Sequence, residues 1–441
     1  MDTETRYNQA LNYLYSFVDY SLKKASELAR AEFNLGRMAA LLEKLGNPHQ
    51  AYPIIHVTGT KGKGSVCALC ASALQAGGYK TGLYTSPHLL DYAERIQVDG
   101  QPIPHGVLAD LVDEIKPAVA GVPKLTTFEI TTALAFLYFA RQGCTAAVIE
   151  VGLGGRLDAT NVVRPKVAVI TSISYDHMAV LGETLTLIAG EKAGIIKENC
   201  PVVSAPQTPE ALKVLEKAAA ERSAPLTLVG REVVITPLMR SLALQTFQVA
   251  SASIPMLTLT IPLLGSHQID NAATAFAALE ASGLGLSYSA IQKGFYRVKW
   301  PARFEVARQE PPVIFDSAHN RDSFARLRQT LDDHFPTRPL YLIFGVSEDK
   351  MLLDMIEEIR PRLTKIIATR ADHPRALEAE KIVEMARQAG VESEAATPVE
   401  AALARALELA GETGIVLSAG SLFVTAEVLR AWKKYKQNEV L

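Results

Sequence analysis

The fold of this 441-residue chain is decided by the stretch His56-Val57-Thr58-Gly59-Thr60-Lys61-Gly62-Lys63-Gly64-Ser65. The β-branched run Ile54-Ile55 precedes it, and apolar residues at helical spacing follow it, at Val66, Leu69, Cys70 and Ala73. The pattern predicts a strand, a glycine-rich loop and a helix. Backbone N–H groups and a helix N-terminus attract phosphate, and a loop lysine such as Lys63 reaches the terminal phosphates. The stretch therefore predicts a nucleotide-binding α/β protein, and a plain tight turn is the alternative.

This glycine loop departs from the standard phosphate-binding motif. Val57 occupies the position of the first glycine of that motif, and Gly64 stands where serine or threonine is usual. The hydroxyl that would serve Mg²⁺ is therefore left open between Ser65 and Ser86.

Strands and helices are expected to alternate on both sides of the loop. We expect strands at 81–84, 146–151, 167–173 and 202–205, and helices at 127–140, 185–197 and 270–281. Such alternation predicts a parallel-rich sheet covered on both faces. The first 50 residues are expected to be helical, ending at Gly46-Asn47-Pro48, and residues 226–262 alternate in a way that predicts a small antiparallel addition.

A second α/β series is expected towards the C-terminus. Its strands are predicted at 313–315, 340–344, 366–368 and 415–417, with an Ala-rich helical stretch at 395–410. We place the boundary between the two series near residue 298, which gives domains at 1–297 and 298–441.

The composition is that of a folded globular protein with a small net charge. Apolar residues make up 48% and charged residues 21%, and the formal net charge is −2. This balance supplies no general attraction for nucleic acid or anionic lipid, so we expect neither nucleic acid nor a membrane as a partner. The N-terminus lacks a signal-peptide pattern, and the longest apolar run, 133–140, is too short to cross a bilayer. The four cysteines form no disulfide framework, so a cytoplasmic location is expected.

Polar residues follow several of the predicted strands, where loops of parallel sheets build ligand sites. Ser86, Glu150 and His177 stand at such positions, and a carboxylate there suits Mg²⁺, which takes oxygen ligands. Taken one at a time, each has a plain structural alternative, such as a solvated glutamate or a satisfied histidine. In the second series Asp316 follows a strand and Arg303 lies near the boundary, which predicts a cleft between two α/β units.

In their order along the chain, these segments resemble the folylpolyglutamate synthase and dihydrofolate synthase enzymes, relatives of the ATP-dependent Mur ligases. The resemblance covers roughly residues 8 to 430 and rests on the motifs GTKGKGS (59–65), TSPHL (85–89), FEITTALAF (128–136), EVGLGGRLDATN (150–161), SYDHMAVLG (174–182), EKAGIIK (191–197), PARFE (301–305) and DSAHN (316–320). It implies a Mur-ligase-like P-loop domain for ATP binding and catalysis at 1–297. A smaller, Rossmann-like glutamate ligase domain would follow at 298–441.

The implied reaction joins L-glutamate to dihydropteroate or to a reduced folate. ATP phosphorylates a carboxylate of the acceptor, and the glutamate amine then attacks the acyl phosphate. ATP and Mg²⁺ are the implied cofactors, and we expect a monomer. The segment Arg156-Leu157-Asp158 is similar to that of bacterial members with both activities, and folate extension alone is the closest alternative.

The resemblance also implies roles for individual residues. The nucleotide contacts are implied at Gly59, Thr60, Lys61, Gly62, Lys63, Gly64, Ser65, Asn271, Arg303, Asp316 and His319. The catalytic residues are implied to be Lys63, His177 and Lys192, the Mg²⁺ ligands Ser86, Glu150 and His177, and the pteroate contacts Thr126, Leu157, Asp158 and Ala159.

Lys192 matches a lysine that is carbamylated in relatives of this family. Carbamylation requires the neutral amine, so the site would have to lower the lysine pKa from about 10.4. An unmodified lysine paired with phosphate is the alternative.

Two further protein classes share part of this pattern. A wall-building Mur ligase shares the chemistry but usually carries an additional N-terminal domain, whereas only some 50 residues precede the glycine loop here. In a P-loop NTPase that is not a ligase, the later motifs would be structural. Glutamate-dependent ADP release discriminates between a ligase and such an NTPase.

Overall fold

The computed structural model describes residues 1–19, 33–348 and 350–439. The chain divides into two compact parts. Unit 1 comprises Met1–Leu238, Thr246–Ile261 and Ile269–Val298, and unit 2 comprises Met239–Gln245, Pro262–Gln268 and Lys299–Leu441. Unit 2 is therefore assembled from three separate segments of the chain. The functional division into 1–297 and 298–441 stays a prediction.

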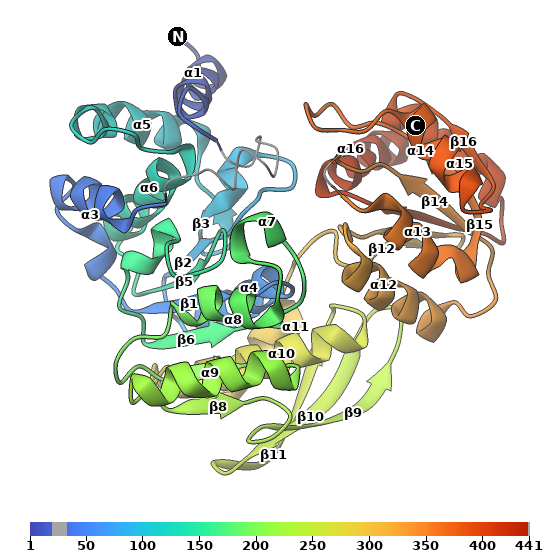
Figure 1. The fold of residues 1–441 in the computed structure, drawn as a ribbon. Helices are drawn as coiled ribbons and strands as arrows, with labels where there is room; N and C mark the ends of the chain where they lie inside the picture. The colour runs from blue at the N-terminus through green and yellow to red at the C-terminus, as the bar shows by residue number, and fades with distance from the viewer. Residues whose placement is uncertain (20–32, 349, 440–441) are drawn as a thin grey trace. The chain divides into compact units, whose positions relative to one another are not determined.

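Unit 1 is built on an eight-stranded sheet of order β4-β3-β2-β5-β1-β6-β7-β8 (Figure 1). Its strands are β1 (Ile54–Thr58), β2 (Thr81–Tyr84), β3 (Ile96–Val98), β4 (Gln101–Pro102), β5 (Ala146–Glu150), β6 (Val167–Ile170), β7 (Val202–Ser204) and β8 (Leu226–Leu228). β3 runs antiparallel to β2 and β4, and the other neighbours pair in parallel. β1, β5 and β6 are buried along their whole length, as a parallel sheet covered on both faces requires. The predicted α/β class is confirmed.

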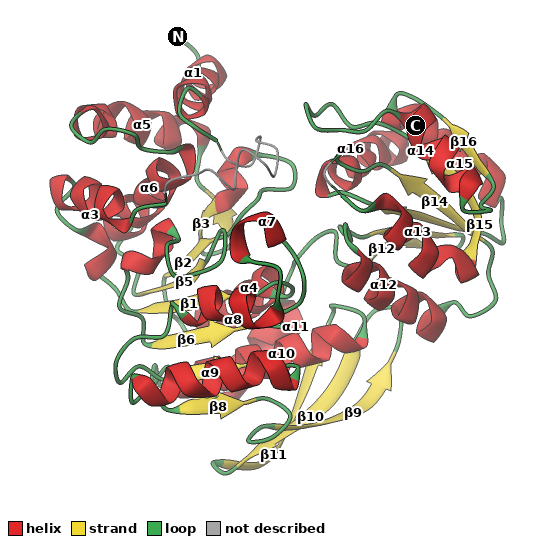
Figure 2. Ribbon diagram, in the orientation of Figure 1, coloured by secondary structure: helices red, strands yellow, loops and turns green. Residues whose placement is uncertain are grey.

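Helices cover both faces of this sheet (Figure 2). The helices of unit 1 are α1 (Thr3–Tyr15), α3 (Leu35–Lys44), α4 (Lys63–Ala76), α5 (His105–Ala120), α6 (Thr127–Arg141), α7 (Met178–Leu181), α8 (Leu185–Ala193), α9 (Pro209–Glu221), α10 (Ser266–Ala281), which belongs to unit 1 from Ile269 onward, and α11 (Tyr288–Arg297). Apolar residues of α1, α3, α5 and α6 share one core with Ile54 and Ile149 of the sheet. On the same face, α8 and α9 pack against Ile170 and Val202.

The helix that follows the glycine loop packs tightly against two others. Ser72 Oγ on α4 donates a 2.7 Å hydrogen bond to Gly294 O on α11, and Cys70 Sγ lies 3.8 Å from Ala275 O on α10. A Cβ at Gly294 would collide with the backbone of Ala73, so only glycine permits this approach. The C-terminal part of unit 1 therefore fixes α4, and with it the glycine loop.

A three-stranded sheet forms the addition that was predicted at 226–262. It consists of β9 (Val234–Arg240), β10 (Gln245–Ser251) and β11 (Ile254–Ile261) in the order β11-β10-β9. Only two residues separate β10 from β11, a connection that antiparallel strands allow and parallel strands do not. The predicted addition began too early in the chain. Its first residues form β8, which pairs in parallel with β7 and belongs to the main sheet.

Unit 2 contains a six-stranded sheet of order β12-β13-β17-β14-β15-β16. Its strands are β12 (Glu305–Gln309), β13 (Pro312–Phe315), β14 (Leu340–Phe344), β15 (Leu363–Ala368), β16 (Ser393–Ala395) and β17 (Ile415–Ala419), and its helices are α12 (Arg321–His334), α13 (Leu352–Ile359), α14 (Ala379–Gln388), α15 (Val399–Ala410) and α16 (Leu422–Glu439). β12 is antiparallel to β13, and the remaining pairs are parallel. Leu264, from one of the two short segments, is buried in this core, and Leu242 from the other packs against it.

Several predicted elements have different ends in the structure. β6 ends at Ile170 rather than 173, α8 ends at Ala193 rather than 197, and α10 begins at Ser266 rather than 270. The predicted N-terminal helical region contains α1 and α3, while its residues 20–32 lie outside the described residues. Among the helices of the described residues, none combines the length and apolar character needed to span a bilayer.

Candidate active site

The glycine loop joins the end of β1 to the start of α4. Gly62 is the N-cap residue of α4 and has φ 93°, a left-handed conformation that favours glycine. A Cβ at Gly62 would overlap the amide oxygen of Asn271 on α10. Asn271, which the sequence analysis assigned to the nucleotide, therefore lies directly against the loop.

The first half of this loop is bonded to the segment after β6, residues 171–176. The N–H groups of Thr60 and Lys61 both donate to Ser172 O, at 2.9 and 3.1 Å. The Thr60 hydroxyl donates to Ser174 O and accepts from Ser174 N, both at 3.1 Å. By contrast, the first-turn N–H groups of α4, from Lys63 to Ser65, have no carbonyl one turn earlier to bond. The start of α4 is therefore the part of the loop best suited to phosphate oxygens.

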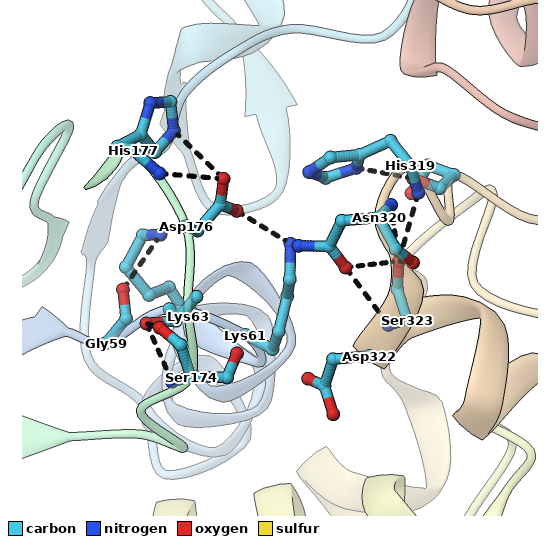
Figure 3. Close-up of polar contacts among 12 residues, drawn as sticks. Gly59, Lys61, Lys63, Ser174, Asp176, His177, His319, Asn320, Asp322 and Ser323 are labelled. Carbon is cyan, nitrogen blue, oxygen red and sulfur yellow. Dashed lines mark hydrogen bonds and ion pairs between the residues drawn. The ribbon is translucent and has the colours of Figure 1, made fainter. Parts of the chain in front are cut away.

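Three lysines surround the glycine loop. Lys63 Nζ lies 3.2 Å from Gly59 O and 3.9 Å from Glu150 Oε1. Lys192 Nζ donates to the same carbonyl oxygen of Gly59 at 2.9 Å. Lys61 turns to Asp176 instead, with Nζ 3.0 Å from Oδ2 (Figure 3). Lys63 and Lys192 thus converge on one atom of the loop.

The environment of Lys192 changes its protonation. Its side chain is on α8 and only 3% of the residue is exposed. Burial lowers the lysine pKa to about 7, and the positive charges of Lys63 and Lys61 act in the same direction while Asp176 opposes them. A large fraction of the amine is therefore neutral near pH 7, which is the state that reacts with CO₂.

Two of the three predicted Mg²⁺ ligands are brought together. Glu150 ends β5 with 5% exposure, and its Oε2 accepts a hydrogen bond from Ser86 N at 3.2 Å. Glu150 thus supplies a buried carboxylate, the kind of oxygen ligand that suits Mg²⁺, next to the backbone of Ser86. The third predicted ligand, His177, lies beside Asp176, with Nε2 3.9 Å from Oδ1. Within the described residues, His, Cys, Asp and Glu side chains form no ready group of three or more for a metal.

Asp158, which the sequence analysis assigned to the pteroate, is engaged within its own loop. Its carboxylate accepts from Leu153 N at 2.9 Å and from the Thr160 N–H and hydroxyl at 3.0 and 2.6 Å. The Thr160 hydroxyl lies 2.9 Å from His56 Nε2 on β1. Burial raises the pKa of Asp158 and lowers that of His56 to about 3. Asp158 therefore shapes the loop at 151–160.

The other three residues assigned to the pteroate differ in exposure. Thr126 is the N-cap of α6 and forms a capping box with Glu129, which engages its hydroxyl. Ala159 is buried, whereas Leu157 is partly exposed. Leu157 is accordingly the one of the four residues whose side chain is most open to a ligand.

The remaining nucleotide residues form a cluster within unit 2. The Asp316 carboxylate accepts from Phe304 N and Ala318 N, both at 2.7 Å. The Arg303 guanidinium donates to Ala302 O at 2.9 Å and to the Ser317 hydroxyl. His319 Nδ1 lies 2.9 Å from Ser317 O, just before α12 (Figure 3). That this cluster and the glycine loop hold one nucleotide stays a prediction.

Asp176 is a further residue of this site, for which the sequence predicted no role. It lies in the quoted SYDHMAVLG motif but received no role there. The signal for it was its place directly before His177, after a predicted strand, and nothing in the pattern indicated that Lys61 would be its partner.

The two units match two families of known domains. Residues 57–279 match the family described as Mur ligase middle domain, and residues 302–422 match the family described as Mur ligase, glutamate ligase domain. The chain is 36% identical to the dihydrofolate synthase/folylpolyglutamate synthase of Bacillus subtilis, over 84% of this chain and 87% of that protein. It is 35% identical to a probable bifunctional folylpolyglutamate synthase/dihydropteroate synthase of Haloferax volcanii, over 97% of this chain and about half (51%) of the relative.

Solved structures share the fold over nearly the whole chain. Mycobacterium tuberculosis folylpolyglutamate synthase complexed with ADP is 33% identical, with a TM-score of 0.88 over 98% of this chain and 99% of that one. The E. coli FolC in complex with DHPP and ADP is 30% identical, with a TM-score of 0.84 over 95% of this chain and 100% of that one. These likenesses span both units, and the chain belongs to the folylpolyglutamate synthase/dihydrofolate synthase family of the Mur ligases.

Proposed function

We propose that this protein is an ATP-dependent ligase that joins L-glutamate, through an amide bond, to the carboxylate of dihydropteroate or of a reduced folate. The observation that carries the proposal is the convergence of Lys63 and Lys192 on Gly59 O, with Glu150 beside Lys63, in a chain of this family. Two lysines and a carboxylate beside the start of α4 match what phosphoryl transfer needs. The relatives solved in complex with ADP support a nucleotide as a ligand of this chain.

The chemistry follows from the poor reactivity of a carboxylate towards amines. Transfer of the terminal phosphoryl group of ATP to the carboxylate creates an acyl phosphate and releases ADP. The amine of glutamate then attacks the carbonyl carbon, phosphate leaves, and the amine loses a proton. Lys63 and the N–H groups at the start of α4 hold the phosphates and offset the negative charge of the transferring group.

Mg²⁺ is proposed at Glu150 and Ser86, with His177 as a further ligand. When bound, Mg²⁺ would neutralise charge on the phosphate oxygens. The Glu150 carboxylate is buried and accepts a hydrogen bond from the Ser86 N–H, so the two residues lie side by side. The Ser65 hydroxyl, on the first turn of α4, is the alternative to Ser86.

Lys192 is proposed to act as a carbamate, formed when its neutral amine reacts with CO₂. Its lowered pKa supports this, and the carbamate would turn a cation beside Gly59 O into an anion able to hold a second Mg²⁺. The alternative, an unmodified lysine that pairs with phosphate, is tested by NMR of protein equilibrated with isotope-labelled bicarbonate. A carbamate resonance that Lys192→Met removes supports the modification, and its absence favours the amine.

We propose that both acceptors are used. Arg156-Leu157-Asp158 supports this, with Asp158 held by three hydrogen bonds that define the loop. The names of the relatives do not decide the matter, because one at 36% identity carries both names and one from Lacticaseibacillus casei at 34% is named folylpolyglutamate synthase alone.

The experiment is ADP release by the purified protein with Mg·ATP and L-glutamate. It is run with dihydropteroate, with tetrahydrofolate, and with neither. Turnover with both acceptors supports the bifunctional enzyme, and turnover with tetrahydrofolate alone reduces it to a folate-extending enzyme. Glutamate-independent turnover, or none, would contradict the ligase and favour a P-loop NTPase of another kind.

A further inference from the structure

Lys61 and Asp176 form a largely buried ion pair beside the glycine loop. Their side chains are 14% and 11% exposed, and Nζ lies 3.0 Å from Oδ2. Removing one partner of such a pair leaves an uncompensated charge away from water, which is far more harmful than losing an exposed ion pair. The pair is therefore expected to hold its two segments together firmly.

The second oxygen of the same carboxylate reaches the start of α7. Asp176 Oδ1 accepts a hydrogen bond from His177 N at 3.0 Å. His177 is the N-cap of α7 and has φ 50°, in the left-handed region that residues other than glycine rarely adopt. Asp176 thus stabilises an unfavourable backbone conformation at the residue proposed to bind Mg²⁺.

The neighbouring contacts between the loop and residues 172–174 are of another kind. They are made by backbone groups and by the Thr60 hydroxyl. Those contacts fix the distance between the glycine loop and residues 172–174, whereas the ion pair adds an electrostatic attraction between the loop and Asp176. Asp176 also acts on Lys192, whose pKa it raises while Lys61 and Lys63 lower it. The Asp176 carboxylate therefore offsets part of the positive charge around the loop.

We propose that Asp176 is a positioning residue that, through Lys61 on one side and the His177 N–H on the other, fixes the glycine loop and the His177 turn in the arrangement that binds Mg·ATP. Lys61 then acts through Asp176 and not on a phosphate. The inference rests on the proposed function of the same site and assigns a role to a residue that has none there.

The test is a double-mutant cycle on nucleotide affinity. Asp176→Asn keeps the size of the side chain and an acceptor for His177 N, but it removes the charge that pairs with Lys61, and Lys61→Met removes the other partner. If the two act as one unit, each single variant weakens the binding of Mg·ATP by about tenfold and the double variant by about tenfold as well. If Lys61 held phosphate independently, the losses would multiply to about a hundredfold, and the proposal would be overturned.

Calorimetric titration with a non-hydrolysable ATP analogue and Mg²⁺ gives these affinities without glutamate or a pterin. The cycle can therefore be read even if the protein has no ligase activity, and failure of the proposed function is seen separately in the ADP-release assay. An unchanged affinity in Asp176→Asn would also overturn the proposal.

A positioning role is separated from a merely structural one by rescue and by kinetics. Asp176→Glu retains the charge and should recover most of the affinity that Asp176→Asn loses. In the ligase assay Asp176→Asn should raise the KM for Mg·ATP more than it lowers kcat, while a loss of folded protein would lower kcat alone. Asp110→Asn breaks an exposed ion pair with Arg6 and serves as the matched control. We expect it to change neither the affinity for Mg·ATP nor the kinetic constants.

Discussion

The amine of Lys192 lies in the interior of unit 1, where its Nζ donates to Gly59 O. Because its pKa falls from 10.5 to about 7 on folding, the folded protein releases this proton at a lower pH than the unfolded chain does. Between these two values the unfolded chain binds more protons, so the free energy of unfolding is expected to rise with pH through this interval. Below it both states are protonated, and the protein carries the full cost of a buried ammonium.

The measurement is urea unfolding across this pH range in buffers freed of CO₂. Lys192→Met removes the titrating group and should flatten the rise, whereas Lys213→Met on the exposed side of α9 should leave it unchanged. If the free energy of unfolding changed with pH in the same way in wild type and Lys192→Met, the pKa of Lys192 would be the same in the folded and unfolded states.

At the level of single residues, the sequence identified which segments build the site but not what each side chain touches. The glycine loop could be predicted because its neighbours in the chain set its conformation. The Lys61–Asp176 pair could not, because the two residues are far apart in the sequence and meet only through the pairing of β1 with β6. Asp158 was assigned to the pteroate by resemblance, and the structure shows its oxygens bonded within the loop.

At the scale of elements, the approach of α11 to α4 depends on one glycine. A Cβ at Gly294 would collide with backbone atoms of Ala73 and Ser72, and backbone cannot give way as a side chain can. We expect Gly294→Ala to lower the free energy of unfolding by about 1–3 kcal/mol, because the two helices must move apart. Chemical denaturation monitored by circular dichroism measures the change.

Gly190 provides the matched control for this substitution. It also lies within a helix, α8, but a Cβ there meets nothing within 4 Å. Gly190→Ala should therefore stabilise the protein by up to about 1 kcal/mol, through the higher helix propensity of alanine. Equal effects at the two glycines would contradict the packing argument.

Tertiary contacts also decide where several of the predicted elements end. β6 stops at Ile170 because Ser172 and Ser174 turn their backbone groups to the glycine loop and leave the sheet. α8 stops at Ala193, and a Cβ on the following Gly194 would collide with Arg156. β12 was not predicted, because its residues are only partly buried and lack a clear alternation. Local pattern finds buried strands well, whereas tertiary contacts decide where they end.

At the scale of the whole molecule, nucleotide binding should be visible as stability. A ligand that binds the folded state alone, at a hundred times its Kd, adds about 2.7 kcal/mol to the free energy of unfolding. Mg·ATP is therefore expected to raise the thermal transition of the protein in a calorimetric scan. Lys63→Ala, which removes the ammonium group beside Gly59 O, should abolish most of this increase, and Lys213→Ala should retain it. An undiminished increase in Lys63→Ala would show that Lys63 does not hold the nucleotide.

The three-segment makeup of unit 2 has a consequence for how the protein is made. Residues 239–245 and 262–268 leave the ribosome before residues 269–298, which complete unit 1. Leu264 cannot be buried in the core of unit 2 until strands such as β14 and β17 have been synthesised. Domains usually fold one after another during translation, the N-terminal one first. Here two segments of unit 2 are synthesised before unit 1 is complete. A fragment of residues 299–441 would lack Leu264, and part of the core of unit 2 would therefore be missing.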